Sequence, residues 1–362
     1  MGFTFIKHDT HIDFVRYRYI SYALSAALLL AGLAWILFGG LRLGIDFAGG
    51  VVVQVQFAQP VDDNALKKSL DVPELPGIST QRYGEGGRDY LLRFSTLDAN
   101  AATLRANVES SLAKAFPGNA ASIQRLELVG PKVGADLTNK ALEALYYAVL
   151  LIAVYISGRF EQRWMAAGAM AAALWGSMWG LGYTGLGMGY LVCAALAVTL
   201  VVCWKLRLNY ALGAVLGLLH DVFITLGLLA ILGVEIDLNV VAALMTLVGY
   251  SLNDTIIVYD RIRENLKLTP DLTMAEIIND SVNQTLSRTI LTSLTTLAAT
   301  LALYLLGGGV IHDFALTMLI GVVVGTFSSV YVCSAVLMTM GETADYVREE
   351  VVYEKPGEHG IV

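Results

Sequence analysis

Two charged residues, Asp254 and Arg288, lie in or at the edge of apolar runs of this sequence, where they can take part in proton transfer. A charged side chain in the middle of a membrane-spanning helix costs about 2.5 to 3.5 kcal/mol, so such residues are usually functional. An aspartate beside an arginine stays charged, whereas an aspartate among apolar groups favours its neutral acid. A carboxylate balanced between these influences can bind and release a proton as helices move.

Simpler roles are also open for both residues. Arg288 can extend its side chain to the lipid headgroups, and Asp254 can be a hydrogen-bonded packing residue. His220 and Asp221 form a second polar pair, which can relay protons or serve as a contact between helices. The polar residues that can support these groups are Tyr250, Asn253 and Thr292, of which Asn253 is expected to be structural.

Long apolar segments must position these residues. The chain has 362 residues, of which 56% are hydrophobic and 15% charged, and its mean hydropathy is +0.61. Soluble domains carry roughly 25% charged residues, so this composition indicates a polytopic α-helical membrane protein. Runs of about 20 apolar residues predict eight membrane-spanning helices. They are expected at 20–41, 141–157, 164–182, 186–204, 209–232, 238–259, 288–306 and 314–340.

Basic residues predict the orientation of these helices. With the N-terminus inside, the short cytoplasmic segments collect most Lys and Arg, whereas the outer loops 183–189, 233–237 and 307–312 contain none. Both termini are therefore expected in the cytoplasm. If the helices on either side of the 260–287 segment fold back on each other, Asp254 and Arg288 reach a similar depth and can meet.

The segment between the first two spans has the composition of a soluble domain. Its hydrophobic pattern predicts the order β-α-β-β-α-β, which is the ferredoxin-like α+β arrangement. The strands are expected at 51–57, 78–84, 89–95 and 122–130, and the helices at 61–70 and 98–116. The domain organisation is therefore an N-terminal segment 1–19, a first span 20–41, an outer domain 42–140, a bundle 141–340 and an acidic tail 341–362.

Motifs for enzymatic chemistry are missing from the sequence. It contains no zinc-ligand spacing, no glycine-rich phosphate loop and no Ser-His-Asp set at one membrane level. The three cysteines lie in apolar spans, where a small buried hydrophobe is the simplest interpretation. We therefore expect no enzymatic activity, no metal and no cofactor other than protons.

Several motifs resemble the SecF branch of the SecD/SecF family, accessory subunits of bacterial Sec translocases within the RND superfamily. The long motif "VVAALMTLVGYSLNDTIIVYDRIREN" is the most specific, and "GIDFAGG" follows the first span. The full set lies at 44–50, 211–221, 240–265, 287–297 and 314–329.

This resemblance implies a subunit of the bacterial inner membrane that works with SecD beside the SecY channel. It implies that the proton-motive force helps unfolded secretory polypeptides to cross, with membrane lipid around the protein and no role for nucleic acid. The family's proton-coupling aspartate and arginine correspond to Asp254 and Arg288. The motif after the first helix includes Gly44, Asp46, Gly49 and Gly50.

One departure from the family concerns the number of spans. Members of the family have six, half of the RND bundle, whereas this sequence has an additional apolar hairpin at 164–204. Both "RFEQRW" and "KLRLNY", at the two ends of that hairpin, resemble the single family loop. Two alternative functions also stay open: a proton-coupled exporter of the RND type, and a scaffold subunit that transports nothing.

Overall fold

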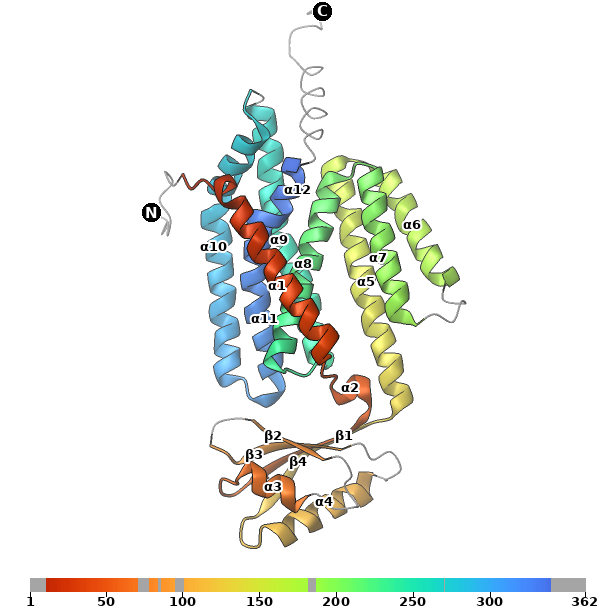
Figure 1. The fold of residues 1–362 in the computed structure, drawn as a ribbon, viewed down its shortest axis with the longest axis vertical. Coiled ribbons are helices and arrows are strands. Elements are labelled where there is room, and N and C mark those ends of the chain that lie inside the picture. Colours follow the sequence, from red (N-terminus) through yellow and green to blue (C-terminus); the bar gives the residue numbers. More distant parts are fainter. Residues whose placement is uncertain are drawn as a thin grey trace, which may run out of the picture.

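A helical bundle with a small α+β domain at one end is the architecture of this protein, seen in a computed structural model (Figure 1). The structure describes residues 11–70, 78–83, 86–94, 101–181, 187–269 and 271–339. The start of α1 and the end of α12 lie at the end of the bundle opposite the β-sheet. The fold class expected from the sequence is confirmed, whereas the expected acidic tail 341–362 lies outside the described residues.

Long apolar helices form the bundle. In the described part of the chain, seven helical stretches are long and apolar enough to cross a membrane, and the apolar stretch 167–176 of α6 is shorter. The helices are α1 (Arg18–Gly39), α5 (Pro131–Glu161), α6 (Trp164–Leu181), α7 (Met188–Lys205), α8 (Asn209–Leu232), α9 (Leu238–Leu268), α10 (Met274–Leu306), α11 (Gly309–Ser328) and α12 (Ser334–Thr339). A π-helical turn, Ser329–Cys333, joins α11 to α12.

Three helices extend well beyond the apolar runs that predicted them. α5 begins at Pro131 instead of 141, α9 continues past residue 259 to Leu268, and α10 begins at Met274 instead of near 288. The start of α10 is fixed by a capping box, in which Thr273 and Glu276 bond each other's backbone amides. Apolar length marks only the membrane part of a helix, so the polar continuation was not predicted.

The outer domain is a four-stranded sheet covered by two helices. The strand order is β2-β3-β1-β4, and every neighbouring pair is antiparallel, as in the ferredoxin-like arrangement. The strands are β1 (Gly50–Phe57), β2 (Ser79–Tyr83), β3 (Asp89–Phe94) and β4 (Ala121–Val129). The helices are α3 (Asp63–Ser69) and α4 (Ala101–Ala115).

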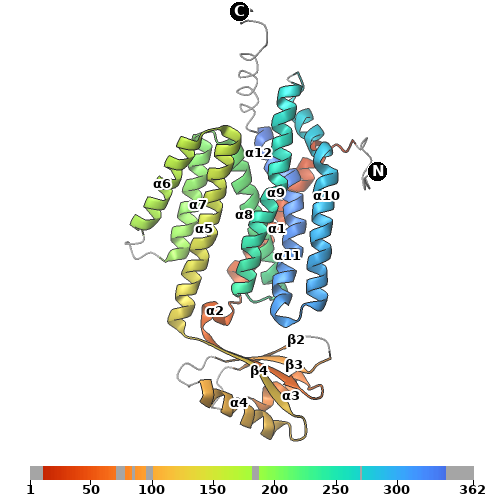
Figure 2. The same cartoon turned by 180° about the vertical axis from the view of Figure 1, so that it is seen from behind.

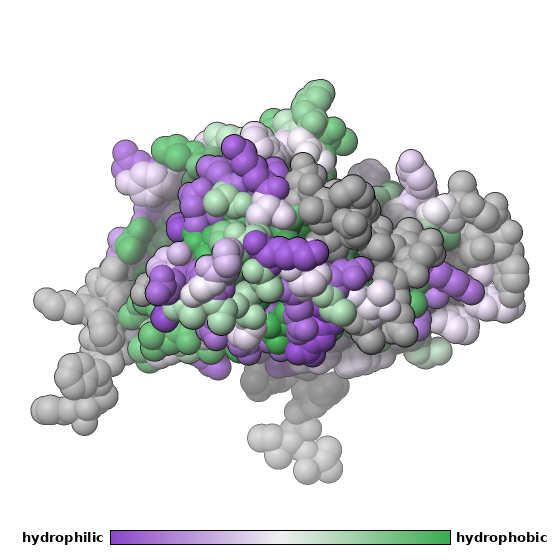
Figure 3. Space-filling model, turned by 90° about the horizontal axis from the view of Figure 1, so that it is seen from below, coloured by the Kyte–Doolittle hydropathy of each residue, from purple (hydrophilic) through white to green (hydrophobic). Residues whose placement is uncertain are grey.

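One face of this sheet holds the core of the domain. Alternate residues of β1, Val51, Val53 and Val55, are fully buried and pack with Leu104 and Val108 of α4. α3 and α4 lie on the side of the sheet away from the bundle (Figure 1). From that end the surface shows mainly polar and weakly polar side chains, with scattered apolar ones (Figure 3). The opposite face of the sheet therefore looks toward the bundle.

Two helix-turn-helix units of the bundle resemble each other. α5 and α6 are joined by a turn that contains Gln162, and α7 and α8 by a turn that contains Arg207. Among the residues that the structure describes, these are the only non-glycine residues with positive φ, 55° in both. The segments after the two turns, "AAGAMAAAL" and "ALGAVLGLL", match at an offset of 45 residues. α6 and α7 pack against α5, at the side of the bundle away from α9, α10 and α11 (Figure 2).

Candidate functional site

Asp254 is buried within the bundle, on α9, with only 1% of its surface exposed. Neither of its carboxylate oxygens accepts a hydrogen bond from a described residue. The polar groups that act on it come from α10: the hydroxyls of Thr292 and Ser293 and the charge of Arg288. A buried carboxylate without hydrogen bonds is unusual in a folded protein and points to a functional group.

Arg288 lies at the same level of the bundle as Asp254. Asp254 precedes the end of α9 by 14 residues, and Arg288 follows the start of α10 by 14 residues. The Arg288 side chain is nevertheless exposed on the outside of the bundle and does not donate to Asp254. The structure therefore brings the two residues to one depth without an ion pair between them.

Hydroxyl groups surround this part of α10. Ser293 and Thr326 of α11 share a hydrogen bond of 2.7 Å, and the Tyr250 hydroxyl donates to Ser293 Oγ over 3.4 Å. Thr292 donates to the Arg288 carbonyl oxygen. Asn253, in contrast, is exposed and lies outside this group. Tyr250 and Thr292 thus line the site that was expected to include them.

This arrangement favours a change of charge that follows a change in packing. A buried negative charge costs free energy unless hydrogen bonds or a cation offset it. Among the described residues none donates a hydrogen bond to Asp254 or forms an ion pair with it, although hydroxyls and a guanidinium are nearby on α10. Donors on α10 that turned toward Asp254 would therefore stabilise its charged form.

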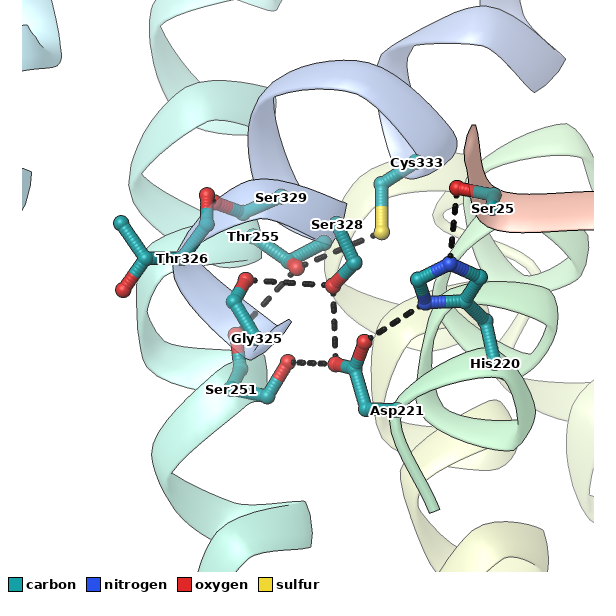
Figure 4. Close-up of polar contacts among 10 residues, drawn as sticks. All are labelled: Ser25, His220, Asp221, Ser251, Thr255, Gly325, Thr326, Ser328, Ser329 and Cys333. Atoms are coloured by element: carbon teal, nitrogen blue, oxygen red, sulfur yellow. Dashed lines mark hydrogen bonds and ion pairs between the residues drawn. The ribbon is translucent and has the colours of Figure 1, made fainter. Parts of the chain in front are cut away.

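Asp221 is the second buried carboxylate, also 1% exposed, and it is fully bonded (Figure 4). Its Oδ2 atom accepts from the hydroxyls of Ser251, at 2.5 Å, and Ser328, at 2.8 Å. His220 Nδ1 lies 2.9 Å from Asp221 Oδ1, and His220 Nε2 lies 3.0 Å from Ser25 Oγ. The pair thus joins α8 to α1, α9 and α11.

Close helix packing makes these contacts possible. A methyl group on Gly325 of α11 would lie 3.0 Å from Ser251 Cβ, so the absence of a side chain lets α11 approach α9. Likewise, a methyl group on Gly32 of α1 would lie 2.9 Å from Gly227 Cα of α8. Small residues therefore hold the helices near enough for short serine side chains to reach Asp221.

The glycine-rich motif after the first span fastens the outer domain to α9. Its Gly44 amide donates to the Ile236 carbonyl oxygen at 2.8 Å, and Asp46 Oδ2 accepts from the Leu238 amide at 3.0 Å. Asp46 lies in a short helix that was not predicted, α2 (Ile45–Ala48). A side chain on Gly44 would crowd Asp237, and Gly49 and Gly50 have φ of +72° and +128°. The motif thus caps the first turn of the helix that carries Asp254.

An ion pair and a cleft complete the junction between the two parts. Arg93 of β3 pairs with Glu235 in the loop between α8 and α9. Burial lowers the pKa of Arg93 from its ordinary value, and the charges of Asp313 and Asp237 oppose that shift. A cleft of ≈ 320 Å³ lies beside this pair, between the sheet and the outer ends of the helices. The sheet face that looks toward the bundle is therefore polar where it meets α9.

Sequence reasoning missed several of these residues. Ser25, Ser251 and Ser328 were not among the expected site residues, although Ser251 precedes Asp254 by three positions and shares its helix face. That spacing was a usable signal for Ser251. Ser25 and Ser328 are isolated polar residues in apolar runs, and only the packing of the helices shows that they meet His220 and Asp221.

Comparison with known families supports the resemblance seen in the sequence. The family described as "Protein export membrane protein SecD/SecF, C-terminal" matches residues 107–185 and 175–343. The "SecD/SecF GG Motif" matches residues 34–61 and so includes the motif that caps α9. The first match is divided within the region of the additional hairpin.

Relatives and solved structures cover nearly the whole chain. A protein translocase subunit SecF from Magnetococcus marinus is 39% identical over 91% of this chain and 92% of its own length. The SecF subunit from Escherichia coli O157:H7 is 36% identical over 95% and 92%. The crystal structure of SecDF, a translocon-associated membrane protein from Thermus, matches 92% of this chain with a TM-score of 0.69 and 30% identity. This chain spans 39% of the length of that SecDF chain. The chain belongs to the SecD/SecF family of protein export membrane proteins.

Proposed function

We propose that this chain is the SecF-type subunit that, with SecD, uses the proton-motive force to promote passage of secretory proteins through the SecY channel of a bacterial inner membrane. The observation that carries the energetic part is Asp254, a buried carboxylate to which none of the described residues donates a hydrogen bond, on the helix to which the outer domain is attached. The relatives named as translocase subunits support the role in export.

Protonation of Asp254 is the first step of the proposed cycle. The neutral acid loses its attraction to the guanidinium of Arg288 and can donate a hydrogen bond to the hydroxyls of α10. The charged form instead favours an arrangement in which those groups turn toward it. A proton can bias the two arrangements only by its different affinity for them, which the change of neighbours supplies.

The motion then passes along α9 to the outer domain. Asp254 is 16 residues from Leu238, a distance of about 24 Å along a helix. At that outer end Asp46 caps the helix, and Glu235, in the preceding loop, pairs with Arg93 of the sheet. A displacement of α9 therefore acts on the outer domain directly, and the domain can alternately hold and release a translocating chain.

The energy of a proton is adequate for such a task. One charge that crosses about 100 mV releases about 2.3 kcal/mol. That is similar to the free energy of one or two hydrogen bonds to a charged group. Rearranging the contacts of Asp254 and of the junction is thus within reach of one or a few protons.

Polar residues on the outside of the bundle support a partner such as SecD. Asn253 of α9 and Arg288 of α10 are exposed at the level of Asp254, where lipid gives no hydrogen bonds. A second membrane subunit against this face would satisfy them. The solved SecDF chain, which is more than twice the length of this one, has room for such a second half.

The decisive experiment compares Asp254→Asn with Asp260→Asn in inverted membrane vesicles that also contain SecD. Asp260 lies on the same helix and allows the same substitution, but it is half-exposed and forms a surface ion pair with Arg159. Proton-driven stimulation of secretory-protein translocation is measured together with proton flux. We expect Asp254→Asn to abolish both while the complex still assembles, and Asp260→Asn to retain most of each. Normal stimulation by an assembled Asp254→Asn complex would contradict the proposal and favour a scaffold subunit. Proton flux coupled to a small molecule, without any effect on translocation, would favour an exporter.

A further inference from the structure

We propose that His220 and Asp221 form a second proton-binding site, coupled to Asp254 through α9. This inference rests on the proposed function, because it adds a second titrating site to the same proton-driven cycle. It is argued from the geometry, charge and surroundings of the pair, and from Ser251, which lies on the same helix as Asp254 and donates a hydrogen bond to Asp221 (Figure 4).

The hydrogen bonds of the pair fix where a proton can be gained. Asp221 Oδ2 accepts hydrogen bonds from two serine hydroxyls. A carboxylate has no hydrogen to donate, so in its third contact, between Oδ1 and His220 Nδ1, the histidine N–H is the donor. That leaves His220 Nε2 facing Ser25 Oγ at 3.0 Å. The Ser25 hydroxyl can donate to a neutral Nε2 or accept from a protonated one. Gain of a proton therefore needs only a rotation of one O–H bond.

The charge of the pair gives this proton a function. With neutral imidazole the pair carries one negative charge, and with imidazolium it is neutral overall. Both residues are buried, with 6% and 1% of their surfaces exposed, so the net charge lies in a medium where charge is costly. Three donors nevertheless stabilise the carboxylate, which assigns the exchangeable proton to the imidazole.

Other titratable groups around the pair are few. α1 presents Ser25, α9 presents Ser251, and α11 presents Ser328 and the ring of Phe327, which stacks on His220 with centroids 6.4 Å apart. The thiol of Cys333, on the π-helical turn, interacts with the Asp221 charge. Among the described residues, no hydrogen bond or ion pair joins the pair to α5 or α7, which also pack on α8. In the described part of the chain, His220 is thus the one group bonded to Asp221 that can become a cation.

The link to Asp254 is one helical turn of α9. Ser251, which donates to Asp221, and Asp254 are both buried and three positions apart, about 4.5 Å of helix rise. Asp221 and Asp254 are thus linked through one serine and one turn of α9, and in buried surroundings a charge on one of them changes the proton affinity of the other. A proton on His220 favours the charged form of Asp254, and its loss favours the neutral form.

A local irregularity of the backbone supports a functional role at the same place. The α-helix α11 ends at Ser328, which bonds Asp221, and changes there into the π-helical turn Ser329–Cys333. π-Helical turns are rare and often occur at functional sites. Ser328, which donates a hydrogen bond to Asp221, therefore lies where α11 changes from α-helical to π-helical geometry.

The test uses the complete complex with SecD in proteoliposomes and three variants: His220→Asn, His220→Gln and Ser328→Ala. His220→Asn and His220→Gln keep polar side chains but cannot titrate, whereas Ser328→Ala removes one hydrogen bond to Asp221 and no titrating group. Proton-driven translocation is measured from pH 5.5 to 8.5. We expect the histidine variants to lose one inflection of the pH profile and about tenfold of the maximal rate, whereas Ser328→Ala lowers the rate without changing the shape of the profile.

A second measurement keeps the proposal testable if the histidine variants do not assemble. The wild-type complex, labelled with 15N-histidine in this chain, is titrated by NMR and compared with Asp254→Asn. The chain contains 5 histidines, and we expect one resonance, absent from an assembled histidine variant or assigned by its contact to Ser25, to titrate and to shift its midpoint when Asp254 is neutralised.

The outcomes separate the two proposals. A His220 signal that does not titrate, or a pH profile of equal shape in assembled His220→Asn and wild type, overturns the second site, and the pair is then a structural clamp. If Asp254→Asn still abolishes proton-driven translocation in that case, the proposed function stands alone. If Asp254→Asn retains it, the proposed function itself fails, whatever His220 does.

Discussion

The helices α8 and α6 resemble each other at their N-terminal ends but lie in different surroundings. Each follows a turn with a left-handed residue, and each has a glycine as its fifth residue, Gly213 in α8 and Gly168 in α6. α8 occupies the centre of the bundle and bonds three other helices, whereas α6 lies at its side. The shared pattern therefore makes a helical hairpin but does not decide where that hairpin lies.

Polar side chains explain the difference. At the positions of α8 occupied by His220 and Asp221, α6 has Trp175 and Gly176 at the same offset of 45 residues. Buried polar groups in a membrane need protein partners, so α8 must lie among other helices. α6 has no such need, and its Trp175 and Trp179 are 57% and 65% exposed, as in a helix that faces lipid.

The largest expected effect separates Asp221 from its counterpart. Asp221→Ala leaves His220, Ser251 and Ser328 without their common acceptor, and we expect a loss of about 3 to 5 kcal/mol of stability. Gly176→Ala, the matched change in α6, should alter stability by less than about 0.5 kcal/mol, because no atom of the described residues lies within 4 Å of the added methyl group. Thermal unfolding of the complex in detergent measures both. Equal losses of stability in the two variants would show that α8 at the centre and α6 at the side of the bundle do not differ in this respect.

The second prediction concerns the two matched glycines. A side chain on Gly213 would meet the Tyr259 hydroxyl and the Cys333 carbonyl oxygen, whereas in the described part of the chain nothing lies within 4 Å of the corresponding position on Gly168. Gly213→Val should therefore cost about 1 to 3 kcal/mol by forcing α8 away from α9. Gly168→Val serves as the control in the same unfolding assay. If Gly213→Val had the stability of wild type, the central helices would be packed less tightly than their contacts indicate.

A smaller effect is expected at the outer end of the central helices, where Asp237 caps α9. Burial raises the pKa of Asp237 above its ordinary value, so the folded protein favours its protonated form. Its contribution to stability is greatest below the ordinary pKa of aspartate, about 3.9, and is lost as the pH rises through the raised pKa. As the pH rises from 4 to 7, the Asp237→Asn protein should therefore lose less stability than wild type. An identical pH dependence in the two proteins would contradict this.

The smallest effect is expected for Trp175→Leu in α6. Its ring faces away from the protein, so stability in detergent and proton-driven translocation should both stay close to wild type. His220→Leu, the change at the matched position of α8, provides the contrast. A marked loss of complex assembly with Trp175→Leu would instead indicate that a partner covers this side of the hairpin.

The sequence predicted the elements better than their contacts. Apolar run length and alternation are local properties, so the membrane parts of the long helices could be predicted, and the strands of the outer domain could be predicted within a few residues. The common depth of Asp254 and Arg288 also followed from counting along two helices joined by a short loop. The direction of the Arg288 side chain did not, because the rotation of each helix about its axis is set by packing.

The serine contacts were beyond local reasoning for the same reason. Ser25 and Asp221 are 196 positions apart in the sequence, and only the glycine contact between α1 and α8 brings their helices together. The short helix α2 was missed because four residues are too few for a periodic pattern. Its role as a cap for α9 is a long-range contact that no local pattern encodes.

The junction of the outer domain determines how that domain can move. Its chain enters from α1 and leaves into α5, and the bridge between Leu43 and Ile236 adds a third attachment at α9. A body held at three points can shift only when those points shift relative to one another. If α1 and α5 stay in place, a displacement of α9 along its axis tilts the domain about the line that joins the other two. The domain then works as a hinged flap with one free direction, so a small axial step within the membrane becomes a larger sweep at its far edge.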